Sequence, residues 1–140
     1  MTDTLDSIIY TAHTRTTGGR DGRGASSDGE LDVRLSKPGS GRPGSNPEQL
    51  LGVGWSACFI GALHRAGQNF AIRLPEDVAV SAEVALGTTA EGGFALAARL
   101  TVELPGLAAE DKARLVEAAH QLCPYSKATR GNIEVSFDIP

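Results

Sequence analysis

The feature that most constrains this chain of 140 residues is a predicted central helix that begins at Pro47. Asn46 is a favourable N-cap, Pro47 suits the first helical position, and Gln49 completes a capping box. From there to Leu63 the helix is apolar around most of its circumference and rich in small residues, in the segment PEQLLGVGWSACFIGAL. A helix without a polar face belongs in the centre of a structure. We therefore expect Cys58, which lies within this segment, to be buried.

Strands are predicted on both sides of this helix. A strand is expected over residues 5–15, and Asp28-Gly29 is a type I′ turn signal that predicts a hairpin. Alternating apolar residues predict three further strands, over residues 77–89, 92–106 and 132–139. A second helix is expected over residues 108–122, and Pro124 must end it. This order indicates the α+β class, with curved antiparallel sheets packed on a central helix.

The length of the chain fits a single domain over residues 1–140, with a core that needs neither disulfides nor structural zinc. The sequence contains no internal repeat. One chain of this size does not cover both faces of so apolar a helix, so we expect a homodimer.

Composition excludes several classes of function. The formal net charge is −4 and the arginines are scattered, so no basic surface for nucleic acid is expected. Aromatic residues make up 5% of the chain, which leaves little for stacking on bases. The N-terminal residues lack the pattern of a signal peptide, and no apolar run is long enough for a membrane span. We expect a soluble, cytoplasmic protein.

The two cysteines, Cys58 and Cys123, are the candidates for chemistry. In a reducing compartment, transient redox chemistry or metal binding is favoured over a permanent disulfide, although two inert thiols remain an alternative. Cys58 lies about 16 Å along its helix, beyond the reach of the helix N-terminus, so its thiolate needs a cation. Cys123 lies at a helix C-terminus, where the dipole opposes negative charge. In a redox pair, Cys58 would attack and Cys123 would resolve.

Two arginines are candidates for that cation. Arg65 lies seven residues after Cys58 on the same helix face, so spacing favours it. Arg20 follows two glycines that would let the backbone turn tightly toward a site. The residues alone leave the choice open.

Three other functions compete with a redox pair. His64 and His120 could join the cysteines in a zinc site, but their spacing is not that of a zinc finger and the chain has no CxxC. A Cys-His hydrolase has the same weak support. A dimeric small-ligand-binding domain with inert thiols is the non-enzymatic alternative.

Four segments, taken together, resemble the organic hydroperoxide resistance proteins of the Ohr/OsmC superfamily. They are TGGRDG at 17–22, NPEQL at 46–50, SACFIGAL at 56–63 and LCPYSKATRGNIEV at 122–135. In order and spacing they cover nearly the whole chain, and the last is specific to the Ohr branch. The departures are mild, with Leu51 and Trp55 where members often carry Phe and Tyr.

The resemblance implies an OsmC-like fold, an intertwined homodimer whose sheets wrap two central helices, and a thiol peroxidase acting on organic hydroperoxides. It implies that Cys58 becomes a sulfenic acid and that Cys123 condenses with it to a disulfide. By the same resemblance, Arg20 holds the Cys58 thiolate and Glu48 anchors Arg20. The implied reductant is dihydrolipoamide or a lipoylated protein, and neither a cofactor nor a metal is expected.

Overall fold

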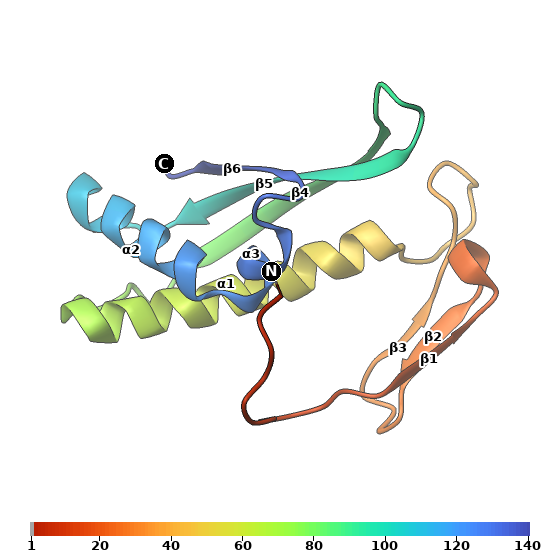
Figure 1. Ribbon diagram of the computed structural model, residues 1–140, viewed down its shortest axis with the longest axis horizontal. Helices are drawn as coiled ribbons and strands as arrows, with labels where there is room; N and C mark the ends of the chain where they lie inside the picture. The colour runs from red at the N-terminus through yellow and green to blue at the C-terminus, as the bar shows by residue number, and fades with distance from the viewer. Residues whose placement is uncertain (1) are drawn as a thin grey trace. The chain divides into compact units, whose positions relative to one another are not determined.

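The computed structural model describes residues 2–140, and the chain divides into two compact units (Figure 1). Unit 1 is Met1–Pro47 and unit 2 is Glu48–Pro140. That the two units act together as a single domain stays a prediction.

Unit 1 contains a three-stranded antiparallel sheet of β1 (Thr14–Thr17), β2 (Arg23–Ser26) and β3 (Asp32–Arg34), in that order. The short 3-10 helix η1 (Gly19–Asp21) connects β1 to β2. The strand predicted over residues 5–15 is therefore wrong for most of its length. A strand needs a partner, and the ladder with β2 begins only where Thr14 pairs with Ser26.

The predicted hairpin is confirmed, but its turn is not type I′. The N–H of Ser26 donates to the Leu31 carbonyl at 2.8 Å, which leaves a longer loop than a two-residue turn. Type I′ needs positive φ at both central residues, and here Gly29 has φ 77° while Asp28 does not have positive φ. The Asp28 carboxylate instead accepts hydrogen bonds from the Ser26 hydroxyl and the Glu30 N–H, at 2.5 and 3.0 Å. These local bonds close the loop in another conformation.

In unit 2, the predicted central helix is confirmed as α1 (Pro47–Phe70), which begins at Pro47 as expected. The three later strands are also confirmed, as β4 (Ala79–Thr88), β5 (Phe94–Glu103) and β6 (Glu134–Asp138), in the order β4-β5-β6. No helix within residues 2–140 is long and apolar enough to cross a membrane.

The ladder between β5 and β6 is parallel, unlike the antiparallel ladders that the sequence led us to expect. β4 and β5 form an antiparallel hairpin, and then the chain leaves the sheet through α2 (Ala109–Leu122) and α3 (Pro124–Thr129). This crossover returns the chain to the end of the sheet at which β5 begins, so β6 runs parallel to β5. Leu100 of β5 pairs with Phe137 of β6.

The core of unit 2 lies between the sheet and the helices, and Figure 1 shows α1 and α2 on the same side of the sheet. Its fully buried side chains include Trp55, Phe59, Leu63, Leu100, Val102 and Leu115. Within unit 2, the sheet and α2 leave the opposite face of α1 open, and Val53 on that face is 72% exposed. Cys58 is half-buried, so its predicted burial is wrong for the single chain. One sheet covers only one face of the helix.

Leu100→Ala should lower the free energy of unfolding by about 2–5 kcal/mol, because a fully buried leucine would leave a cavity. Arg99→Ala is the matched control on the same strand. Its side chain is 57% exposed and lies 3.6 Å from Asp138, so its loss should cost about 0–1 kcal/mol. Urea unfolding at one protein concentration measures both, and equal losses would contradict this account of the core.

Candidate active site

The two cysteine sulfurs are in contact inside unit 2. The Cys123 thiol donates to the Sγ of Cys58, with 3.5 Å between the two sulfurs. Cys58 comes from the middle of α1, and Cys123 lies between α2 and α3. Both are free thiols, and Cys123 is fully buried. A disulfide has its sulfurs about 2.05 Å apart, so a displacement of about 1.5 Å would join them.

The surroundings of Cys58 favour the neutral thiol. Burial is the main cause that raises the pKa of Cys58, and the neighbouring Cys123 thiol raises the pKa further. A backbone hydrogen bond from Tyr125 acts in the opposite direction and lowers this pKa. None of these influences is cationic. A reactive thiolate at Cys58 therefore calls for a positive charge.

The segment that carries Cys123 differs from the prediction. Pro124 does end α2, at Leu122, but a further helix, α3, begins at once with Pro124 in its first turn. Cys123 is the C-cap of α2, with its N–H bonded to the Ala119 carbonyl at 2.8 Å, and it is also the N-cap of α3. Proline at the first helical position is the signal that could have predicted α3.

A buried hydrogen bond joins α1 to α3 one helical turn away from each sulfur. The indole Nε1 of Trp55 donates to the hydroxyl of Ser126 at 3.3 Å, and both residues are fully buried. Trp55 lies three residues before Cys58, and Ser126 lies three residues after Cys123. Sequence reasoning gave neither residue a catalytic role and did not pair them, since they lie 71 residues apart along the chain.

Arg20 lies in unit 1, in η1, after two glycines in the left-handed region, Gly18 with φ 76° and Gly19 with φ 58°. The adjacent Asp21 carboxylate ties this turn to the loop after β3. It pairs with the Arg42 guanidinium, lies 3.5 Å from Nζ of Lys37, and accepts the Lys37 N–H at 3.3 Å. The turn that presents Arg20 is thus anchored within unit 1.

Glu48 lies in the first turn of α1, in unit 2. The structure therefore brings Cys58 and Cys123 together, whereas the predicted contacts of Arg20 with Cys58 and Glu48 join two units. Those contacts stay a prediction. Arg65, the alternative cation, is exposed on α1.

His64 and His120 are the candidates for a zinc or hydrolase site. Among residues 2–140, no group of three or more His, Cys, Asp or Glu side chains could hold a metal ion. His64 is exposed. His120 packs edge-on against Phe137 with ring centroids 4.9 Å apart, and its buried Nδ1 has no hydrogen-bond partner in the described residues. Burial and the nearby Arg130 lower the pKa of His120. His120 is thus a partly buried residue whose ring packs against Phe137.

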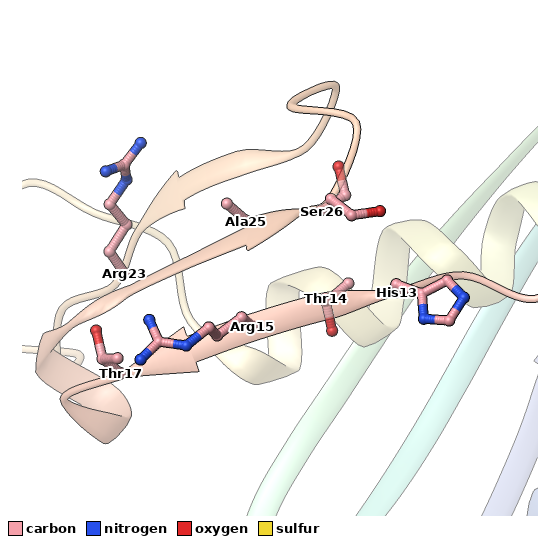
Figure 2. A pocket seen from close by; sticks show the side chains of 8 residues that line it. His13, Thr14, Arg15, Thr17, Arg23, Ala25 and Ser26 are labelled. Atoms are coloured by element: carbon pink, nitrogen blue, oxygen red, sulfur yellow. The ribbon is translucent and has the colours of Figure 1, made fainter.

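Unit 1 has an open hollow along β1 and β2, shown in Figure 2. Its lining is formed by His13, Thr14, Arg15, Thr17, Arg23, Ala25, Ser26 and Ser27. Arg23, at one end, is engaged in a bidentate pair with the Asp32 carboxylate. None of the four predicted site residues lines this hollow.

The family model described as OsmC-like protein matches residues 38–138. The chain belongs to this family. It is 44% identical over 138 residues, 96% of each sequence, to an organic hydroperoxide resistance protein of Xanthomonas axonopodis pv. citri. The crystal structure of the organic hydroperoxide resistance protein OhrB of Bacillus subtilis is 39% identical, with a TM-score of 0.89 over 95% of this chain and 100% of that one.

A second solved structure agrees with the first. The organic hydroperoxide resistance protein OsmC of Legionella pneumophila is 38% identical, with a TM-score of 0.88 over 95% of this chain and 98% of that one. Within the OsmC-like family, the chain therefore belongs to the organic hydroperoxide resistance branch, and the predicted OsmC-like α+β fold is confirmed.

In the reduced protein, one equivalent of N-ethylmaleimide should label Cys58 before Cys123, because Cys58 is half-buried and Cys123 is fully buried. Peptide mass spectrometry identifies the labelled residue. Cys58→Ser should leave only slow labelling, and Cys123→Ser should keep the fast phase. Equal labelling of both residues would contradict the burial of Cys123.

Proposed function

We propose that this protein is a cysteine-based thiol peroxidase that reduces organic hydroperoxides to alcohols. The names of its relatives support the broader role, detoxification of organic hydroperoxides. The single observation that supports the thiol mechanism most directly is the contact of 3.5 Å between the sulfurs of Cys58 and Cys123. Two inert core thiols have no need of such a contact, whereas a peroxidatic and a resolving cysteine do.

In the first step, the Cys58 thiolate attacks the distal oxygen of the hydroperoxide. The O–O bond breaks, the alkoxide leaves and takes a proton to become the alcohol, and Cys58 becomes a sulfenic acid. In the second step, the Cys123 sulfur attacks the sulfenic sulfur, water leaves, and the Cys58–Cys123 disulfide forms. A dihydrolipoyl group then supplies two electrons and two protons, which restore both thiols and oxidise the dihydrolipoyl group to its own disulfide.

Arg20 is the proposed cation for the first step, and Glu48 is proposed to hold it in place. The resemblance in the TGGRDG and NPEQL segments supports both roles. The surroundings of Cys58 support the need for a cation, because burial and Cys123 raise the pKa of the Cys58 thiol. A planar guanidinium can contact the thiolate and the leaving oxygen at the same time, which an ammonium does less well.

The proposed substrates are alkyl, aryl and fatty-acid hydroperoxides in preference to hydrogen peroxide. Cys58 packs against the hydrophobic core, next to the fully buried Phe59. Burial of an organic tail near this sulfur would contribute about 25 cal/mol per Å² of apolar surface. Hydrogen peroxide has no such tail.

The proposed assembly is a homodimer, in which a second copy covers the apolar surface that a single chain leaves open. On α1, Val53 is 72% exposed. In unit 1, Leu5, Ile8, Ile9 and Tyr10 are 70–98% exposed. Apolar surfaces of this kind mark contacts with another chain. The cytoplasmic location stays a prediction.

The first experiment treats the reduced protein with one equivalent of cumene hydroperoxide, with hydrogen peroxide in parallel, and measures free thiols and intact mass. Both thiols of a chain should be lost together, faster with cumene hydroperoxide, and dihydrolipoamide should restore them. Survival of both thiols would overturn the peroxidase proposal and favour a ligand-binding domain with inert cysteines.

Single substitutions separate the two cysteines. Cys58→Ser should abolish peroxide reduction, because the attacking sulfur is gone. Cys123→Ser should allow one turnover and then stop at a sulfenic acid on Cys58, which dimedone traps for mass spectrometry. Normal turnover of Cys123→Ser with dihydrolipoamide would refute the resolving role.

Arg20→Ala should raise the pKa of Cys58, because loss of an adjacent cation disfavours the thiolate. The pH profile for alkylation of Cys58 should move to higher pH, and peroxide reduction at pH 7 should slow by roughly tenfold or more. Arg65→Ala is the control and should leave the profile unchanged. A shift in Arg65→Ala but not in Arg20→Ala would return the role to Arg65.

A further inference from the structure

We propose that Trp55 and Ser126 are a positioning pair, which holds Cys123 within reach of the Cys58 sulfenic acid and thereby sets the rate of disulfide formation. This inference rests on the proposed function and deepens it. It concerns the second chemical step, whereas Arg20 and Glu48 are proposed for the first.

The pair joins the two elements that carry the sulfurs. Nε1 of Trp55 on α1 donates to Oγ of Ser126 on α3 at 3.3 Å. Both residues are 0% exposed, so when a substitution removes one partner, water does not take its place and the other partner is left without a hydrogen bond. Each lies three residues from a cysteine along its helix, on the same side of the helix as that cysteine. The hydrogen bond and the sulfur contact are thus two adjacent links between α1 and the Cys123 segment.

α3 depends on this link for its position. The helix has six residues, and Ser126 is the buried residue among them. A helix of this length is not stable by itself, so its place is set by its contacts with the rest of the unit. Close packing beside the bond agrees with this, since a Cβ added to Gly54 of α1 would lie 3.2 Å from the Tyr125 hydroxyl of α3.

The position of α3 controls Cys123 because Cys123 is its N-cap. The Cys123 carbonyl accepts the N–H of Lys127 at 3.0 Å, so a shift of the helix moves the cysteine backbone. Disulfide formation needs an approach of about 1.5 Å from the observed separation. A Cys123 held near this position attacks as an intramolecular nucleophile of high effective concentration, and a displaced one does not.

Two variants remove one partner each. Trp55→Phe keeps an aromatic side chain but lacks the N–H, and Ser126→Ala lacks the hydroxyl. Each should slow disulfide formation by roughly tenfold, the effect of losing one neutral buried hydrogen bond. Attack of Cys58 on the hydroperoxide should change by no more than about threefold, because its thiolate depends chiefly on the proposed cation. The longer-lived sulfenic acid should also give more sulfinic acid when peroxide is in excess.

The measurement is a single turnover with one equivalent of cumene hydroperoxide, quenched at successive times with dimedone and then N-ethylmaleimide. Intact mass gives the amounts of thiol, sulfenic acid and disulfide, and hence a rate for each step. Lys127→Ala, on the exposed side of α3, is the matched control and should leave both rates unchanged. The double variant of Trp55→Phe with Ser126→Ala should be no slower than the slower single variant, because both remove the same bond.

The outcomes are distinct. Disulfide formation at the normal rate in either variant overturns the proposal, and so does equal slowing of both steps, which would indicate a general structural defect. Should Trp55→Phe fail to fold, Ser126→Ala alone decides between these results. If the unsubstituted protein retains both thiols after peroxide treatment, the proposed function itself fails and the positioning role fails with it.

Discussion

The packing of one face of α1 on the β4-β5-β6 sheet and α2 is the contact on which the rest of unit 2 depends. Trp55, Phe59 and Leu63 are fully buried along this face, and each of them lies within two turns of Cys58. Burial of side chains of this size contributes about 1.5–3 kcal/mol each. The packing that stabilises unit 2 therefore also fixes the position of Cys58 relative to the sheet and α2.

The partial exposure of Cys58 within unit 2 follows from the single sheet that packs on α1. Because the sheet covers only one side, Cys58 is half-buried, while Cys123 behind it is fully buried. This arrangement agrees with the proposed roles, in which Cys58 meets the substrate and Cys123 meets only Cys58. The environment of Cys58 within unit 2 also opposes ionisation, because burial and the neighbouring Cys123 thiol raise the pKa of Cys58.

Much of the fold follows from local patterns. Period-2 alternation predicted β4, β5 and β6, and the Pro47 cap predicted the start of α1. The errors occur where a distant partner decides the outcome. Residues 5–13 have strand-forming side chains but no pairing strand within residues 2–140, and β6 is parallel because a crossover through two helices returns it to the sheet. In the Asp28-Gly29 turn, side-chain hydrogen bonds replace the expected geometry.

The sequence by itself determined the chemical inventory of this protein: two cysteines, the arginine and glutamate of two recognisable motifs, and an apolar helix that starts at Pro47. These are properties of residue type and short-range spacing, which a linear pattern carries. Only the tertiary structure decided that the sulfurs of Cys58 and Cys123 lie 3.5 Å apart and that Trp55 bonds Ser126 across two helices. Contacts between residues so distant in the chain depend on how whole helices pack, and helix packing is set by the shape of the complete core.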